Sequence, residues 1–586
     1  MVGLLIVAKL FNLSNLSTKF ASGCKYKFLL LDLAIVFKKI LNRFLVVFLA
    51  CISFWASAQT AHKFSHSEYL HGQLSSFKTC FDVKQYEITV RVDPEKHFIS
   101  GNNIISFKVL SNFKKMQLDL FAEIKIDSII FESNNLNFTH DNNAFFVEFS
   151  EKLVKNTNHQ LVIYFEGAPR AAKNPPWDGG FVWSKDSDGK PWVGLACEGL
   201  GASCWLPCKD HLSDEADSLK MHLIVPDYLT GVSNGKLISS NRLGDGFAQY
   251  NWQVLSPINN YNITINIGNY VHLSDKYVSN FNLSQRSLYL DYYVLKQNAQ
   301  KAALYFHDEV KKMLDCFETR FGTYPFYQDG YKLVETPYWG MEHQSCVSYG
   351  NDYKKNKWNF DFIIVHESAH EWFGNSLSCV DPAEMWIHES FTTYAEALYM
   401  ECHYGYESYV NYLKSQKGNI ENKEPMIGPY DVYFHGRKDN DIYYKGSWML
   451  HTLRSVIDND STWFALLLEL NFRYQKSNVT TASIIHFFNT YSKRNFSPFF
   501  KQYLYGKDIP EFDYKIVEKE GRQELHYRWR NTIKGFEMPI KMTISKDLFE
   551  FVYPSKSWQV LDLNFSNPDD FKIQSDRFLI NVKKIK

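Results

Sequence analysis

The chain has 586 residues, more than one hydrophobic core usually organises, so its length predicts two to four domains. Hydrophobic residues make up 45% of the chain, charged residues 22% and aromatic residues 16%, a composition that excludes an intrinsically disordered protein. Lys and Arg together number 64, as do Asp and Glu, so no net charge draws the protein to nucleic acid or to an anionic membrane. We therefore expect a globular protein that does not bind nucleic acid.

The first 58 residues have the pattern of a secretory signal. Basic residues up to Arg43 precede the apolar run 44–55, and small residues follow up to Ala58. The run is shorter than the roughly 20 residues of a membrane-spanning helix, so we expect cleavage after Ala58 and no span in the mature chain. This pattern predicts a periplasmic or extracellular protein. Lipidation of Cys51 is the alternative to simple cleavage, and the late position of the run leaves the true start codon open.

Three segments of different periodicity follow. Alternation of period two indicates a β-rich domain over 59–270. Apolar residues at helical spacing dominate 271–509, which predicts a mainly helical domain. Alternation returns after Pro510 and predicts a small β-sandwich over 510–586. The fold class is thus multidomain α+β, and the principal expected helices cover about 298–321, 361–374, 389–403, 446–457 and 464–474.

Ten cysteines are too few for a disulfide-stabilised scaffold in a chain of this length, so we expect one or two bridges at most. Cys197, Cys204 and Cys208 lie close together in the sequence but lack the paired short spacing of a structural zinc site. We expect these three side chains to be buried or bridged.

The strongest motif is HEXXH, which comprises residues 366–370. Side chains four residues apart share one face of a helix, so His366 and His370 can reach the same cation. Glu367 borders that face and can take a proton from water without being a ligand. A catalytic zinc commonly has a third protein ligand. Glu389, after a gap of eighteen residues, suits this position at the start of the next helix.

The chain resembles the zinc aminopeptidases typified by aminopeptidase N and leukotriene hydrolase, gluzincins whose signature is HEXXH followed after eighteen residues by Glu. Three further motifs occur in the family's order: the Gly-Met-Glu-His segment 340–343, the Tyr-Tyr-Lys-Gly segment 443–446, and Glu198 followed by Pro-Cys-Lys-Asp at 207–210. The resemblance implies a saddle-like N-terminal β domain, a thermolysin-like catalytic domain and a small C-terminal β-sandwich. The long helical C-terminal domain of larger members is missing from the pattern.

For catalysis, the resemblance implies one zinc ion held by His366, His370 and Glu389, with Glu367 as the general base. The tetrahedral oxyanion formed during peptide hydrolysis needs a positioned donor besides the metal. The resemblance assigns that role to Tyr443.

For substrate binding, the resemblance implies that Glu198 and Glu342 bind the free amino terminus of a peptide. Buried carboxylates can make this distinction because only a chain end supplies the ammonium group. Gly340 and Met341 would present backbone groups to the first substrate residue, and a glycine allows close approach. The predicted substrates are peptides with a free amino terminus; the sequence predicts neither the preferred first residue nor the oligomeric state.

The chain departs from the family pattern around these motifs. His343 and His388 replace Asn, Ser390 replaces Gly, and Ser203 replaces Arg. For His388 we expect a backbone-positioning or surface role in preference to extra metal ligation, because adjacent helical side chains point about 100° apart.

The predicted reaction is therefore hydrolysis of N-terminal peptide bonds. Two alternatives keep the scaffold, a zinc endopeptidase and an epoxide hydrolase. A third is a secreted binding protein without turnover, although intact His366, Glu367, His370, Glu389 and Tyr443 count against it.

Overall fold

The computed structural model describes residues 63–281, 286–433, 436–565 and 567–586. The chain divides into two units, Met1–Phe64 and Ser65–Lys586, and the fold below is that of the second. The expected signal segment 1–58 lies outside the described residues. Within the described ranges, no helix is both long and apolar enough to cross a membrane.

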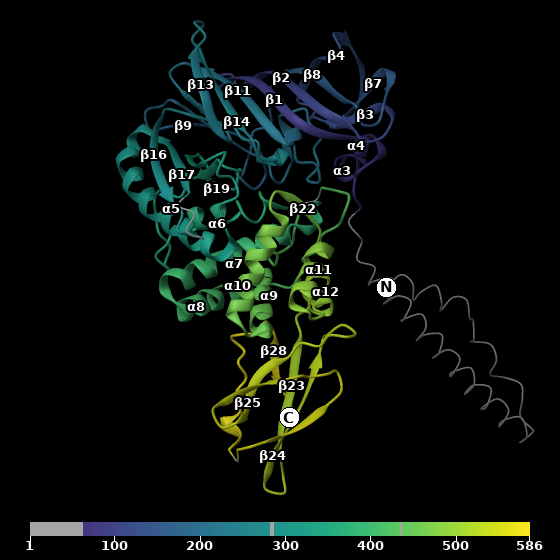
Figure 1. The fold of residues 1–586 in the computed structure, drawn as a ribbon, viewed down its shortest axis with the longest axis vertical. Helices are drawn as coiled ribbons and strands as arrows, with labels where there is room; N and C mark the ends of the chain where they lie inside the picture. The colour runs from purple at the N-terminus through teal and green to yellow at the C-terminus, as the bar shows by residue number, and fades with distance from the viewer. Residues whose placement is uncertain (1–62, 282–285, 434–435, 566) are drawn as a thin grey trace, which may run out of the picture. The chain divides into compact units, whose positions relative to one another are not determined.

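The first part of the unit is built from three β-sheets (Figure 1). Strand β1 (Phe81–Asp93), in the interior of the largest sheet, buries Tyr86, Ile88, Val90 and Val92. The period-two pattern therefore corresponds to the face of the strand that points into the core. An eight-stranded sheet has the order β13-β14-β11-β1-β2-β8-β4-β5, with β1 (Phe81–Asp93), β2 (Phe98–Val109), β4 (Ile124–Phe131), β5 (Asn134–Asn135), β8 (Asn158–Gly167), β11 (Ser218–Pro226), β13 (Lys236–Arg242) and β14 (Phe247–Val254). One smaller sheet has four strands in the order β12 (Thr230–Val232), β15 (Asn266–Gly268), β10 (Pro191–Ala196) and β9 (Gly180–Lys185). The other has three strands in the order β3 (Phe113–Asp119), β7 (Ala144–Leu153) and β6 (Asn137–Asp141).

A five-stranded sheet begins the next part of the chain and has the order β16-β17-β18-β20-β19. Its last strand, β19 (Gly340–Met341), pairs with β20 on one side only and therefore forms an edge. An edge strand offers unpaired backbone groups to another extended chain. The other strands are β16 (Tyr270–Val278), β17 (Ser287–Leu295), β18 (Tyr331–Glu335) and β20 (Val347–Tyr349).

Within the described residues, eight α-helices lie around this sheet and in the green part of Figure 1. The first of them ends at Phe321, where the sequence predicted, and Gly322 caps it with φ of 96°. A disulfide between Cys316 and Cys402 joins α5 (Ala299–Phe321) to α7 (Trp386–Tyr404), whereas Cys197, Cys204 and Cys208 are buried and unbridged. The helices are α5 (Ala299–Phe321), α6 (Phe362–Ala369), α7 (Trp386–Tyr404), α8 (Tyr406–Gln416), α9 (Tyr444–Ile457), α10 (Asp460–Tyr474), α11 (Thr481–Ser492) and α12 (Ser497–Tyr505).

The helix expected over 361–374 is shorter than predicted. It ends at Ala369, with His370 still in a helical conformation at its C-cap. Beyond it the chain forms wider turns, because the amides of Asn375 and Ser376 bond to carbonyls five residues back. Gly374, with φ of 133°, allows this change of direction.

The last part of the chain forms two sheets, so the predicted α+β class is confirmed. Leu525, Tyr527 and Trp529 are buried in β24, in line with the alternation expected after Pro510. Near the end of the chain, β28 begins at Asn581 and Val582 is exposed. The strands are β23 (Glu511–Lys519), β24 (Arg522–Arg530), β27 (Gln559–Leu563) and β28 (Asn581–Lys584), and β25 (Ile540–Ser545) with β26 (Leu548–Val552).

Candidate active site

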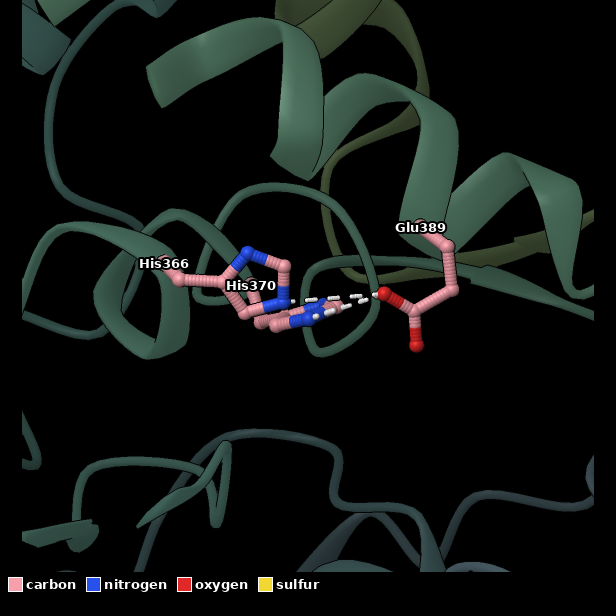
Figure 2. A group of neighbouring side chains, drawn as sticks. All are labelled: His366, His370 and Glu389. Carbon is pink, nitrogen blue, oxygen red and sulfur yellow. Dashed lines mark ion pairs between the residues drawn. The ribbon is translucent and has the colours of Figure 1, made fainter. Parts of the chain in front are cut away.

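His366, His370 and Glu389 converge on one point between α6 and α7 (Figure 2). The carboxylate atom Oε2 of Glu389 lies 3.7 Å from Nε2 of His366 and 3.6 Å from Nε2 of His370. Donors bound tetrahedrally to zinc at about 2.1 Å lie roughly 3.4 Å from one another, so this spacing fits the ion. All three side chains are buried, and no hydrogen bond within the described residues reaches Oε2 of Glu389. A buried donor set of this kind fits a zinc ion.

Both imidazoles are oriented by their second ring nitrogen. Nδ1 of His366 lies 2.6 Å from Oε1 of Glu396, and Nδ1 of His370 lies 2.9 Å from the carbonyl oxygen of Phe373. Carboxylate and carbonyl oxygens accept hydrogen bonds, so each Nδ1 donates and each Nε2 keeps its lone pair for a cation. The sequence interpretation missed Glu396. Its position two helical turns after Glu389, on the same face of α7, was the available signal.

Glu396 is itself held by two further side chains. The Tyr412 hydroxyl and the Gln416 amide both donate hydrogen bonds to its Oε2. These two residues lie on α8, so a third helix supports the orientation of the His366 ring. The imidazole is thereby fixed before any ligand arrives.

Glu367 and Tyr443 face the same cavity as the cluster. A Cβ on Gly340 would lie 2.6 Å from Oε1 of Glu367, so the glycine leaves the room that this carboxylate occupies. Tyr443 lies at the N-cap of α9, and burial with the Glu389 carboxylate nearby raises the pKa of its hydroxyl well above the usual value. Burial raises the pKa of Glu367 to about 7, and burial lowers the pKa of His370 well below its usual value. His370 is accordingly a neutral imidazole, the form that binds metals.

Glu198 and Glu342 form the acidic end of the cavity. Glu198 lies in the turn after β10, and Glu342 follows β19 directly. Burial, with the Glu367 carboxylate nearby, raises the pKa of Glu198 to about 7. Burial, with Glu198 nearby, raises the pKa of Glu342 well above its usual value. Glu198 thus lies near enough to Glu342 for their negative charges to repel, and a cation bound between them would be stabilised.

The Glu342 segment is fixed by residues from two other segments. The Tyr261 hydroxyl donates to Oε1 of Glu342 at 3.2 Å, and the Asn375 amide donates to the Glu342 carbonyl at 2.7 Å. Asn262 in turn donates to Oδ1 of Asn375 at 3.0 Å. Glu342 is thus fixed both by the segment after the metal helix and by the segment leading to β15.

The cavity has a volume of about 950 Å³ and connects the acidic end to the histidine cluster. Trp339 stacks on Phe362, and Phe362 stacks on His366, so an aromatic wall leads from the cluster toward solvent. Trp339 is 45% exposed. Lys357 and Arg437 add positive charge to a lining that also contains acidic, polar and apolar side chains.

Two family models match the chain in the order of its domains. The Peptidase M1 N-terminal domain matches residues 83–262, and the Peptidase family M1 domain matches residues 305–503. The chain belongs to peptidase family M1. The second match contains His366, His370 and Glu389, and the first contains Glu198.

Relatives within family M1 are distant in sequence. Probable aminopeptidase 1 of Sulfurisphaera tokodaii is 21% identical over 75% of this chain and 53% of its own length. Aminopeptidase N of Caulobacter vibrioides is 23% identical over 49% of this chain and 34% of its own length. The chain spans about half the length of the first of these relatives and about a third of the second.

Solved structures of family M1 share the fold. A mutant of an M1 zinc metallopeptidase from Deinococcus radiodurans, solved with a Tyr-Ser-Ala substrate, has a TM-score of 0.62 and 18% identity. The match covers 75% of this chain and 96% of that one. The M1 family relationship and these neighbours imply zinc as the metal.

The departures from the M1 pattern have structural partners. His388 is buried, and its Nε2 accepts a hydrogen bond from the Cys379 backbone N–H at 2.9 Å. This contact agrees with the expected backbone-positioning role, whereas the alternative expectation of a surface role is wrong. Ser390 donates to the Ile442 carbonyl at 2.7 Å, directly before Tyr443. Nδ1 of His343 lies 3.1 Å from the Ser348 hydroxyl.

Proposed function

We propose that the protein is a zinc-dependent aminopeptidase that removes single residues from the amino termini of peptides. One zinc ion would be held by His366, His370 and Glu389. The observation that carries the proposal is the position of this cluster in one cavity with the acidic pair Glu198 and Glu342. A metal cluster alone is compatible with metal-dependent hydrolases of several kinds. An acidic pair at one end of the cavity, in contrast, selects a substrate that ends in an ammonium group.

The chain's own residues supply proton transfer and charge stabilisation. Zinc, when bound, polarises the substrate carbonyl and acidifies water. Glu367 takes a proton from the attacking water and returns it to the leaving amine as the peptide C–N bond breaks. A pKa of about 7 suits both steps, since the carboxyl can change protonation state at neutral pH. The Tyr443 hydroxyl donates a hydrogen bond to the oxyanion that forms on the carbonyl oxygen.

Substrate orientation follows from the edge strand and the acidic pair. β19 has one unpaired side, where Gly340 and Met341 can bond to an extended peptide backbone. Glu342 follows this strand, so a peptide bonded to β19 presents its terminal ammonium to Glu342 and Glu198. The ammonium also offsets the repulsion between the two carboxylates.

The test is metal analysis of the purified protein, followed by a panel of free-amine aminoacyl substrates with and without a chelator. We expect about one zinc per chain, turnover of free-amine substrates, and loss of turnover on chelation. A peptide and its N-acetylated form provide the matched control. Equal cleavage of both would indicate an endopeptidase. Bound peptide without turnover would indicate a binding protein, and turnover of a lipid epoxide would indicate an epoxide hydrolase.

We also propose that the protein is exported. The basic, apolar and small-residue order of residues 38–58 supports export, as does the disulfide between Cys316 and Cys402, because such bonds persist in oxidising compartments. The mass of the N-terminal peptide of the mature protein tests this. A peptide that begins at Gln59 indicates cleavage after Ala58, a lipid-modified Cys51 indicates a tethered protein, and an uncleaved terminus contradicts export by this signal.

A further inference from the structure

A short helical segment before the first strand packs against two loops, one that contains Asp210 and one that contains Tyr433. It consists of α3 (His66–Gly72) and α4 (Ser76–Thr79). Its end is closely fitted, because a Cβ on Gly72 would lie 2.3 Å from the backbone nitrogens of Val432 and Tyr433. The Lys78 ammonium, which is buried, donates to the His71 carbonyl at 2.7 Å. The segment is therefore part of the packed unit.

His71 contacts both loops at once. Its ring stacks on Tyr433, with the centroids 4.1 Å apart and the planes at 11°. Its Nε2 lies 3.1 Å from Oδ2 of Asp210, a carboxylate that is fully buried. Burial raises the pKa of Asp210, but the nearby His71 and the Ser203 hydrogen bond outweigh it and hold the pKa below its usual range.

Asp210 in turn holds the turn that carries Glu198. The Ser203 backbone N–H donates to Oδ2 of Asp210 at 2.9 Å. Gly201, with φ of 80°, lies so close that a Cβ would be 2.1 Å from the same oxygen. The Gly201 N–H donates to the Cys197 carbonyl at 2.7 Å and closes the turn around Glu198. The carboxylate that His71 contacts thus fixes the backbone on which Glu198 lies.

Tyr433 belongs to the loop on the other side of His71. In that loop, the Asp431 N–H donates to Oδ2 of Asp381 at 3.1 Å, and the Tyr430 hydroxyl donates to Oε1 of Glu384 at 3.1 Å. Asp381 and Glu384 bracket the short helical turn that leads into α7, the helix of Glu389. His71 therefore contacts one loop tied to the acidic pair and another tied to the metal cluster.

We propose that His71 is a positioning residue, which sets the position of Glu198 through Asp210 and fixes that turn against the Tyr433 loop. The proposal rests on the proposed aminopeptidase function for its kinetic consequence. An ammonium bound by Glu198 is held in both the ground state and the transition state, so misplacing Glu198 raises KM and changes kcat little. His71 does not line the cavity, and its effect is indirect.

The experiment compares His71→Ala and His71→Phe with a matched control. His71→Ala removes the ring, and His71→Phe keeps a ring for Tyr433 but loses the contact with Asp210. The control is His272→Ala, because His272 stacks on Tyr293 at 4.6 Å and pairs with Asp291 at 2.7 Å, away from the cavity. Each full-length protein is assayed for kcat and KM on a free-amine aminoacyl substrate. Hydrogen exchange is then measured in peptides that cover residues 197–204 and 421–433.

We expect both His71 variants to raise KM on the order of tenfold, with kcat within about twofold of the wild type. Exchange should be faster in 197–204 for both His71 variants, faster in 421–433 for His71→Ala, and unchanged in both peptides for His272→Ala. Unchanged exchange in 197–204 in both His71 variants would overturn the proposal, as would equal changes in the control. If the wild type turns over no free-amine substrate, the proposed function fails, and the exchange data still decide whether His71 orders the Glu198 turn.

Discussion

The two ends of the cavity are assembled in different ways. The metal cluster comes from α6 and α7, which are close in sequence, and its supporting residue Glu396 lies on α7 as well. The acidic end joins Glu198, in the turn after β10, to Glu342, beyond β19 and far along the chain. One end therefore depends on helix geometry and the other on the packing of distant segments. Their variants should accordingly differ in kinetic signature.

The largest effect is expected for Glu367→Gln at the metal end. The Gln side chain has the same shape as Glu and still fits beside Gly340, but its amide cannot accept a proton from water. The kcat should therefore fall about 10³-fold. Zinc content and the thermal unfolding midpoint should stay near the wild-type values. Steady-state kinetics with metal analysis checks this. A kcat above a tenth of the wild-type value would remove Glu367 from its assigned role.

Glu342→Gln should separate the acidic end from the metal end. The amide can still accept the Tyr261 hydrogen bond but carries no charge for an ammonium, so KM should rise about 10- to 100-fold with a smaller change in kcat. The control is Glu371→Gln, since Glu371 is buried, accepts the Ser345 N–H at 2.7 Å and does not line the cavity. Equal effects in the two variants would mean that Glu342 acts only through packing.

Glu396→Gln tests the support of the metal end. Loss of the carboxylate at Nδ1 of His366 should weaken zinc affinity about 10- to 100-fold. Titration with zinc in the presence of a competing chelator measures this change. Excess zinc should restore most of the activity, because all three metal ligands remain. Wild-type affinity in the variant would show that the His366 ring is oriented without Glu396.

Gly446→Ala should have the smallest effect on activity and a measurable one on stability. A Cβ at this position would lie 1.7 Å from the Ser390 hydroxyl oxygen, so the substitution overpacks the contact between α7 and α9. Overpacking of this kind costs about 1–3 kcal/mol in the free energy of unfolding. Adding Ser390→Gly to the same chain should recover most of that loss in denaturant unfolding. No recovery would mean that the strain lies elsewhere.

The parts of the site that could be predicted from the sequence are those with local spacing. His366 and His370 lie one helical turn apart, and Glu389 lies in the first turn of the next helix, so periodicity was enough to place them. Glu396 shares the Glu389 face, but its spacing alone did not reveal that His366 would be its partner. The end of α6 at Ala369 was also missed, because the wider turns after it depend on Gly374 and on longer-range backbone bonds.

By itself, the amino-acid sequence determined the α+β class, the family resemblance and the identity of the candidate ligands. These features follow from residue periodicity and short motifs, which the local geometry of helices and strands controls. Only the tertiary structure decided that Glu198 and Glu342 face one cavity, that β19 is an edge, and that His71 contacts Asp210 and Tyr433. Such contacts join segments far apart in the chain, and their geometry arises from packing rather than from local backbone preference.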